Sequence, residues 1–331
     1  MSDPNQFACY ATCMRSFVID TDTASDDAVA LIMALRYPDV EVKAITVVAG
    51  NVSLEQGCRN ALYTVELCGA NVPVYAGAAK PLARDLEDAR WFHGKDGLGD
   101  RNYPAPRSAL AKGDAIDVII ETARTNRGLT LVTLGPLTNI ALALQKSPDL
   151  AKNIGRCVVM GGNPCCEGNV TPAAEFNIYV DPEAAALVFR SLPVEMIGWQ
   201  LSRAQAVVNE SEIARLREMN TALATFCVDC NCRAVEAFRE QTGEAGIALP
   251  DPIAMAVALQ PEICLDSSEH RVEIETASEL TRGQTVVDRL NVSSDARNRG
   301  AWSNGSARIK TRVCWKIDVP GWKQLLFESL R

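Results

Sequence analysis

The chain has 331 residues, of which 47% are hydrophobic, so it is long enough to bury a large core. Its formal net charge of -8 at pH 7 argues against nucleic acid or an anionic membrane as a main partner, because both repel a negative surface. No apolar run of about 18 residues occurs, which excludes the usual pattern of a membrane-spanning helix. Residues 1–14 lack the apolar segment of a secretory signal and are predicted to be a loosely ordered lead-in to a single domain over residues 15–331.

The first two thirds of the chain alternate short apolar runs with longer helical patterns. Strands are predicted at residues 16–19, 42–48, 72–75, 129–134, 157–160 and 194–197. Helices are predicted between them, at residues 26–36, 54–68, 115–124, 137–145 and 182–189. Such alternation is typical of βαβ units with right-handed crossovers. The predicted fold class is therefore α/β, with an open, mainly parallel, Rossmann-like sheet and helices on both faces.

In the last third of the chain the regular alternation of predicted strands and helices ends, although no linker or repeat occurs there. Residues 210–240 predict one or two helices, and residues 252–259 predict another. Three further strands, expected to pair antiparallel, are predicted at residues 272–275, 286–290 and 309–317. We interpret these elements as C-terminal helical and β embellishments of the same domain. In open parallel sheets the ligand lies outside the carboxyl ends of the strands, so the turns after the strands are where chemistry is expected.

Twelve cysteines are present, and only a few of them cluster. Cys227, Cys230 and Cys232 form a C-x-x-C-x-C pattern of the kind that can hold zinc. No second cysteine pair follows at zinc-ribbon spacing, so we interpret the thiols as small, reduced, packed side chains. Reduced thiols and the absence of a signal segment predict a cytoplasmic protein.

Four carboxylates fall within eight residues at the end of the first predicted strand: Asp20, Asp22, Asp26 and Asp27. Thr23 followed by Asp26 resembles a capping box, which would begin the next helix near residue 24. Capping explains one or two acidic residues, but four carboxylates this close repel one another unless a cation compensates. Hard oxygen ligands in this number favour Ca²⁺ or Mg²⁺.

A second enzyme class fits the same short motif. Asp20-x-Asp22 after an apolar strand is also found in phosphatases of the haloacid dehalogenase type, with Asp20 as nucleophile and Asp22 as acid/base. That alternative requires a later strand that ends in a lysine and another that ends in an acidic pair. Neither occurs at a convincing position, and the motif alone leaves both classes open.

Motifs along the rest of the chain follow the order found in one family. They are the aspartate cluster, Val47-Val-Ala-Gly-Asn51, His93-Gly-Lys-Asp-Gly-Leu-Gly99, Leu134-Gly-Pro-Leu-Thr-Asn139, Met160-Gly-Gly, Glu167-Gly-Asn169, Ala174-Glu-Phe-Asn177, Asp181-Pro-Glu-Ala184 and Asp251-Pro252. On these motifs, residues 16–256 resemble the inosine–uridine-type nucleoside hydrolases, which are calcium-dependent N-ribohydrolases. The resemblance implies hydrolysis of the N-glycosidic bond of a ribonucleoside by a metal-activated water, giving ribose and free base for purine or pyrimidine salvage.

The resemblance also implies a metal site. Ca²⁺ would be held by the side chains of Asp22, Asp27 and Asp251 and by the main-chain oxygen of Leu134. Asp22 would serve in addition as the general base on the activated water. Without the family, Asp251 followed by a proline would be interpreted as an ordinary helix start.

On the sugar side, the resemblance implies a set of residues that contact the ribose: Asp26, Asn51, Met160, Asn169, Glu175 and Asn177. Amides and carboxylates suit this task, because each ribose hydroxyl both donates and accepts. The alternative interpretations are a turn residue for Asn51 or Asn169 and a solvated loop charge for Glu175. The implied partners are a small-molecule nucleoside and further copies of the chain, in a dimer or tetramer.

The sequence departs from the family on the nucleobase side. Many relatives carry a histidine before the Asp-Pro pair, but here that position is Pro250, which cannot donate a proton. His93 is retained and is the remaining candidate for a catalytic role near the base. Phe226, Phe238 or Arg233 is expected to contact the base. A relative that binds a nucleoside or ribose without hydrolysis stays open as a further alternative.

Overall fold

The computed structural model describes residues 14–295, 297 and 309–331. Apart from Met14, the predicted lead-in at residues 1–14 therefore lies outside the described residues. Within the described part, no helix combines the length and the apolar character needed to span a membrane.

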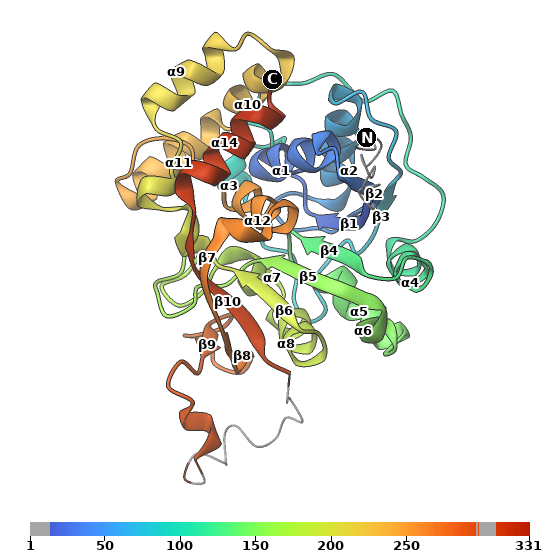
Figure 1. Cartoon of the computed structure of the whole chain (residues 1–331), viewed down its shortest axis with the longest axis vertical. Helices are drawn as coiled ribbons and strands as arrows, with labels where there is room; N and C mark the ends of the chain where they lie inside the picture. The colour runs from blue at the N-terminus through green and yellow to red at the C-terminus, as the bar shows by residue number, and fades with distance from the viewer. Residues whose placement is uncertain (1–13, 296, 298–308) are drawn as a thin grey trace, which may run out of the picture.

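Eight strands form one central sheet in the order β3-β2-β1-β4-β5-β6-β10-β7 (Figure 1). They are β1 (Arg15–Thr21), β2 (Val40–Val47), β3 (Val74–Ala76), β4 (Leu129–Thr133), β5 (Ile154–Met160), β6 (Val194–Ile197), β7 (Cys264–His270) and β10 (Thr311–Ile317). Every neighbouring pair is parallel except β7 and β10. The predicted open, mainly parallel sheet is confirmed.

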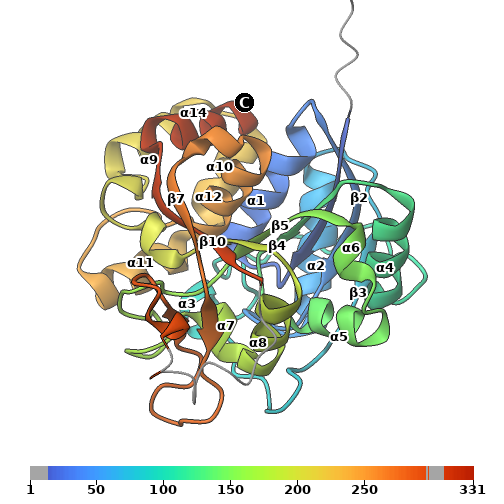
Figure 2. The same ribbon diagram turned by 60° about the horizontal axis from the view of Figure 1, so that its bottom comes forward.

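Helices cover both faces of the sheet (Figures 1 and 2). Successive residues of a strand point to opposite sides, so Phe17 and Ile19 enter one core and Val18 enters the other. The first face is covered mainly by α1 (Ser25–Arg36), α2 (Leu54–Leu67), α9 (Glu210–Glu218), α10 (Ala222–Cys230), α12 (Pro250–Leu259) and α14 (Val319–Ser329). The second face is covered by α4 (Ala115–Thr125), α5 (Thr138–Lys146) and α8 (Pro182–Ser191).

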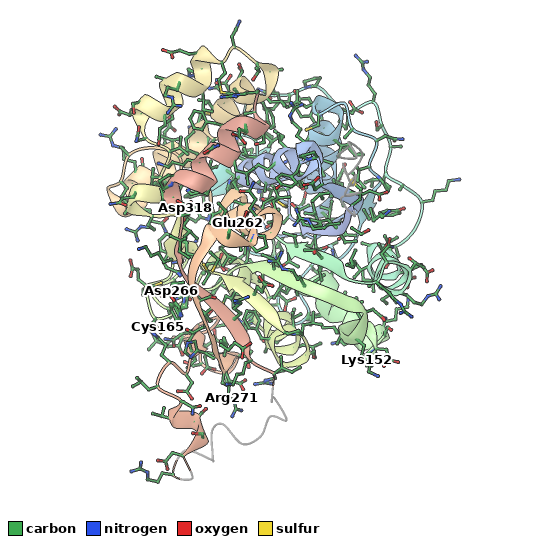
Figure 3. All side chains as sticks on the ribbon, viewed as in Figure 1. Lys152, Cys165, Glu262, Asp266, Arg271 and Asp318 are labelled. Atoms are coloured by element: carbon green, nitrogen blue, oxygen red, sulfur yellow. The ribbon has the colours of Figure 1, made fainter. Side chains whose placement is uncertain are left out.

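Short helical segments complete the structure. They are α3 (Arg90–His93), α6 (Leu150–Asn153), α7 (Phe176–Val180), α11 (Cys232–Thr242) and the 3₁₀ turns η1 (Trp199–Ser202), η2 (Ala204–Ala206), η3 (Pro261–Ile263) and η4 (Val292–Ser294). Several helices begin where a capping side chain satisfies a free backbone amide, as Asp114 does for α4 and Asp181 does for α8. Charged side chains such as Lys152 of α6 lie at the periphery, where Lys152 pairs with Asp149 (Figure 3).

The C-terminal third corrects three expectations. Residues 210–240 form three helices rather than one or two, because α9 ends at Glu218, just before Asn220, whose φ of 52° is left-handed, and the chain breaks again at Asn231. β8 (Val272–Ile274) and β9 (Thr285–Val287) pair antiparallel as predicted. The third predicted strand, β10, was wrongly grouped with them, since it joins the main sheet between β6 and β7. The edge strand β7 and the helix α14 were not predicted.

The direction of the sheet order changes between β1 and β4. The chain continues from β1 to β2 and β3 on one side, whereas β4 is followed by β5 and β6 on the other. Just past the end of β4, the Leu134 amide donates to the main-chain oxygen of Asp20 in β1 at 2.8 Å. Loops that leave a sheet in opposite directions open a crevice at its carboxyl edge, which is where ligands bind in folds of this kind.

Candidate functional site

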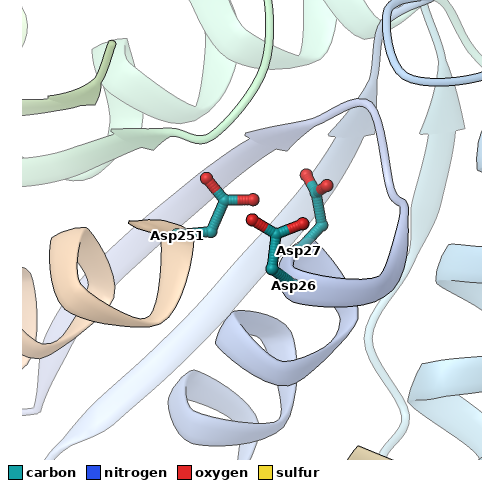
Figure 4. Close-up of side chains that lie close together, drawn as sticks. All are labelled: Asp26, Asp27 and Asp251. Carbon is teal, nitrogen blue, oxygen red and sulfur yellow. The ribbon is translucent and has the colours of Figure 1, made fainter. Parts of the chain in front are cut away.

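Three carboxylates from distant parts of the chain meet at this crevice. Asp26 and Asp27 lie in the first turn of α1, and Asp251 lies in the first turn of α12 (Figure 4). Each contributes a carboxylate oxygen that lies within 4.8 Å of the other two. All three side chains are buried. The packing of α12 against α1 therefore brings residue 251 to the aspartates near residue 26.

The neighbouring residues Asp26 and Asp27, at the start of α1, differ in their hydrogen bonds. The expected pairing of Thr23 with Asp26 is wrong by one residue: Ala24 is the N-cap, and Asp27 accepts a hydrogen bond from its amide at 2.9 Å. Thr21 also donates its hydroxyl to Asp27 at 2.6 Å. Asp27 is thereby fixed in place. By contrast, Oδ1 of Asp26 is buried and has no hydrogen-bond partner among the described residues.

Asp22 lies beside this group and is held by the turn after β2. The backbone amide of Asn51 donates to Asp22 Oδ2 at 2.6 Å, and the Asn51 side-chain amide donates to Asp27 Oδ2 at 3.1 Å. Asn51 therefore bridges the two carboxylates. The other Asp22 oxygen, Oδ1, is buried and has no partner among the described residues.

The electrostatics of this cluster fit a bound cation. Burial, followed by repulsion from Asp27, raises the pKa of Asp22 and raises that of Asp26 to about 8. Burial also raises the pKa of Asp251. In the described part of the chain, the one basic group within ion-pair distance of these carboxylates is His93, whose Nδ1 lies 3.9 Å from Asp26 Oδ1. Burial lowers the pKa of His93 to about 3. Buried, mutually repelling carboxylates with free oxygens form a donor set that suits a divalent ion such as Ca²⁺.

A pH dependence of stability follows for the metal-free protein. The pKa of Asp26 rises from 3.8 to about 8, so between these values the folded protein holds a proton that the unfolded chain has lost. The stability that this proton gives the folded protein is present in full below pH 3.8, and it is lost as the pH rises through about 8. We expect the melting temperature of chelator-treated protein to fall between about pH 5 and about pH 8, and Ca²⁺ to restore more stability at the higher pH. Asp26→Asn should flatten the dependence; an unchanged slope in calorimetry would contradict this origin.

Asp20 lies beneath the cluster rather than in it. Thr46 and Asn139 donate to Asp20 Oδ1 at 2.5 and 2.8 Å, and burial raises its pKa to about 7. The side chain is 0% exposed and does not line the cavity described below. Asp20 instead ties β1 to the neighbouring β2 and α5.

Two glycines allow the backbone to approach Asp22 closely. The backbone of Gly50 packs against one carboxylate oxygen, and a Cβ atom on Gly135 would lie 2.5 Å from Asp22 Oδ1. The neighbouring atoms belong to a short, buried side chain that cannot move far. Both glycines therefore keep the Asp22 carboxylate in place.

Alanine at Gly135 is expected to displace Asp22 and to lower the hydrolysis that the family resemblance implies by at least about 100-fold, because misplacement by about 1 Å is costly at a catalytic group. Ribose release measures the effect. Gly128→Ala is a suitable control for the added methyl group, since nothing lies within 4 Å of the Cβ position at this surface turn, although its left-handed φ of 78° adds some backbone strain. Equal activity of the two variants would contradict the tight packing around Asp22.

A cavity that is partly open to solvent lies over Asp26 and Asp251. It is lined by nine of the residues predicted for the site: Asp26, Asn51, His93, Leu134, Met160, Asn169, Glu175, Asn177 and Asp251. Asp22 and Asp27 do not line it, but Asn51 connects both of them to its wall. Tertiary structure thus gathers one continuous site from segments spread between residues 22 and 251.

Hydrogen bonds hold Glu175 and Asn177 in the wall formed by α7. Glu175 is 2% exposed and accepts from the amides of Gly162 and Asn177 at 2.8 and 2.9 Å, so the interpretation of Glu175 as a solvated loop charge is wrong. The Asn177 side-chain amide donates to the main-chain oxygens of Leu134 and Met160 at 2.7 and 3.2 Å. These contacts fix the Leu134 and Met160 carbonyl groups at the wall of the cavity.

Of the three alternatives expected near a nucleobase, one lines the cavity and two do not. Phe238 lines the cavity. Phe226 does not; its ring packs against Tyr103 at a centroid distance of 5.0 Å. Arg233 does not line the cavity either, and it pairs with Asp100 and with a glutamate of its own helix.

Several cavity residues were missed. Trp91 and Trp199 supply apolar surface, and Asn231 supplies a buried amide. The Asn231 amino group donates to the main-chain oxygen of Cys227 at 2.8 Å, which leaves Oδ1 as a buried acceptor without a partner among the described residues. No local motif marks these positions, because their role depends on how α3, η1 and α11 meet.

The cysteine cluster does not form a metal site in the part of the chain that the structure describes. Cys227 and Cys230 are buried, and the Cys230 thiol contacts the Ser25 main-chain oxygen at 3.6 Å. Cys232 contacts the Gly99 main-chain oxygen at 3.3 Å. Within the described residues, the one potential metal-binding group of three or more side chains is the acidic one. The thiols pack against helix ends, in agreement with the simpler interpretation.

Comparisons with known proteins identify the family of the chain. Residues 17–324 match the sequence model of a family described as inosine-uridine preferring nucleoside hydrolase. The pyrimidine-specific ribonucleoside hydrolase RihA of Salmonella gallinarum is 38% identical over 95% of this chain and 97% of its own length. The protein of the same name from Salmonella typhimurium is 42% identical over the same shares.

Solved structures of the same kind are also similar. A plant nucleoside hydrolase superposes with a TM-score of 0.89 at 29% identity, covering 96% of this chain and 99% of that one. A purine-preferring ribonucleoside hydrolase from Gardnerella vaginalis has a TM-score of 0.84 at 31% identity, covering 96% and 98%. None of these proteins supports the phosphatase or the non-hydrolytic alternative.

Proposed function

Because the chain belongs to the inosine-uridine preferring nucleoside hydrolase family and is therefore an N-glycosyl hydrolase, we propose that the cavity over Asp26 and Asp251 binds a ribonucleoside and that water cleaves it to ribose and free base. One observation carries the assignment of this site: Asp26, which has a buried oxygen without a partner among the described residues, lines a cavity together with Asp251, the Glu175 carboxylate and several asparagine side chains. Ribose needs such groups, and the developing positive charge on its ring is stabilised by nearby carboxylates.

The metal that we propose is Ca²⁺, held by Asp22, Asp27, Asp251 and the Leu134 carbonyl. The oxygen-only donor set and the unpartnered Asp22 Oδ1 support this choice. When bound, such a cation lowers the pKa of water and so favours attack at neutral pH. Asp26, whose oxygen is also within 4.8 Å of Asp27 and Asp251, would be free to bind a ribose hydroxyl.

Each protein group then has a defined task. Asp22 Oδ1 takes the proton from the attacking water, while Asn51 fixes the carboxylate through its other oxygen. Glu175 and Asn177 hold sugar hydroxyls and keep them oriented, because their own positions are fixed by backbone hydrogen bonds. These hydrogen bonds support the proposal that this loop region holds the sugar rigidly.

The nucleobase would lie between aromatic side chains, with Asn231 Oδ1 as a buried acceptor. Because the Asn231 amino group is already bonded, Oδ1 selects a base that presents an N–H donor. We expect Asn231→Leu to raise KM at least about tenfold for such nucleosides while changing kcat less. Gln241→Leu, at the exposed rim of the same cavity, is the matched comparison. Equal effects of the two variants would contradict recognition by Asn231.

A nucleoside panel tests the proposed function. Purified protein is incubated with Ca²⁺ and inosine, adenosine, uridine or cytidine, and free ribose is measured. Release of ribose that a chelator abolishes is the expected result. If no substrate gives ribose although nucleosides raise the melting temperature, the protein is a binding relative instead.

We further propose that the reaction serves nucleoside salvage in the cytoplasm. All the described cysteines are free thiols, which supports a reducing compartment. Self-association into a dimer or tetramer remains a proposal that light scattering on the purified protein would test.

A further inference from the structure

Ser25 and His93 form a buried contact at the edge of the cavity. Ser25 begins α1 between the aspartate turn and Asp26, and it is 0% exposed. His93 ends α3 and is 6% exposed. The Ser25 hydroxyl oxygen lies 2.9 Å from His93 Nδ1, a hydrogen-bond distance in which either atom is able to donate.

The available partners of the Ser25 hydroxyl decide which of the two atoms donates. Among the described residues, His93 Nδ1 is the one hydrogen-bond partner of the Ser25 hydroxyl. A buried hydroxyl proton without an acceptor is costly, so it must point to Nδ1. The next acceptor near this nitrogen, Asp26 Oδ1, is 3.9 Å away and beyond hydrogen-bond reach. Nδ1 therefore accepts and carries no proton.

The ring proton must then lie on the other nitrogen. Nε2 of His93 has no hydrogen-bond partner among the described residues. It is also not among their side-chain atoms that are both fully buried and without a partner. His93 lines the cavity, so this nitrogen is open to a ligand or to water. We propose that Ser25 is a positioning residue that fixes His93 as the Nε2–H tautomer, so that His93 donates a hydrogen bond to the departing nucleobase.

This role rests on the proposed function and completes its nucleobase side, where Pro250 offers no donor. As the N-glycosidic bond breaks, its electron pair moves onto the base, and the Nε2–H group stabilises the developing negative charge. His93 keeps its proton throughout. The proton that the free base finally carries balances the one released when water adds to the sugar, so atoms and charges balance without a further reactant.

The second histidine provides an internal contrast. Nδ1 of His270 faces the main-chain oxygen of Asp288 at 3.1 Å, and a carbonyl oxygen can only accept. His270 must therefore be the Nδ1–H tautomer, with Nε2 accepting from the Ser268 hydroxyl at 2.7 Å. Because the chain contains two histidines, one spectrum can report both tautomers.

Nitrogen NMR of protein labelled with ¹⁵N-histidine tests the assignment without any turnover. The expected result is an Nε2–H tautomer for His93 and an Nδ1–H tautomer for His270, with His270→Asn used to assign the signals. Ser25→Ala should convert the His93 signals to a tautomer mixture, and Ser25→Thr should restore the single form. An Nδ1–H tautomer for His93 in the wild-type protein would overturn the proposal, whatever the variants do.

Kinetics with two leaving groups test the consequence. Nitrophenolate leaves readily without a hydrogen-bond donor, whereas a nucleobase does not. In Ser25→Ala, the fall in kcat for a nucleoside should exceed that for 4-nitrophenyl riboside by at least about tenfold, with recovery in Ser25→Thr. Equal losses on both substrates would indicate a merely structural role and overturn the proposal. If the wild-type protein cleaves neither substrate, the proposed function fails, while the tautomer measurement still stands on its own.

Discussion

Replacing Asp251 by alanine is expected to weaken Ca²⁺ binding by at least about 100-fold and to lower kcat/KM for a nucleoside by at least about 1000-fold. Asp251 is the one carboxylate of the cluster that comes from α12, so its removal opens one side of the site while leaving the turn after β1 intact. Titration calorimetry measures the metal affinity, and ribose release measures turnover. Both quantities should fall together, because the same oxygen serves both.

Asp266→Ala on the edge strand β7 is the matched control, since this aspartate is exposed and does not line the cavity (Figure 3). It should change neither quantity. Deleting a buried carboxylate also removes repulsion from Asp26 and Asp27, so the metal-free Asp251→Ala protein should not melt below the wild type. An Asp251→Ala protein that binds Ca²⁺ as tightly as the wild type would rule out the proposed set of ligands.

Asparagine at Asp22 is expected to lower kcat by about 1000-fold. The substitution keeps the shape of the side chain, and its oxygen can still accept from the Asn51 amide, but an amide does not take a proton from water. Ribose release at saturating Ca²⁺ separates this loss of basicity from weaker metal binding. The expected pattern is a large fall in kcat with a smaller change in KM.

Asp114→Asn is the control for this experiment, because Asp114 caps α4 and asparagine caps a helix equally well. It should leave turnover unchanged. Wild-type turnover in Asp22→Asn would assign the general base to another group.

Much of the fold could be predicted because its signals are local. The run from Phe17 to Ile19 is apolar and ends in aspartates, so both the strand and the chemistry after it are visible in one short segment. The alternation of strands and helices then predicts the sheet. Asp251 is different: its place opposite Asp27 depends on α12 packing against α1, and only the family resemblance pointed to it.

The rest could not be predicted for physical reasons. β7 is an edge strand with the sequence CLDSSEH, whose side chains are mostly exposed, so it lacks the apolar pattern that identifies strands. Asn231 is left with Oδ1 as its unpartnered acceptor because its amino group donates to the Cys227 main-chain oxygen, a contact that no sequence pattern encodes. Thr23 and Asp26 were expected to form the capping box of α1, whereas the structure has Ala24 as the N-cap and Asp27 as the carboxylate that accepts from its amide. The capping role therefore belongs to Asp27 and not to Asp26.

The long separation along the chain between Asp27 and Asp251 also matters during protein synthesis. The N-terminal aspartates leave the ribosome early, while α12 appears only after some two hundred further residues have been made. Until then these carboxylates lack their partner from α12, and they can stay hydrated because the crevice is not yet closed. Ca²⁺ is therefore expected to join late and to lock a nearly complete chain, rather than to nucleate its folding.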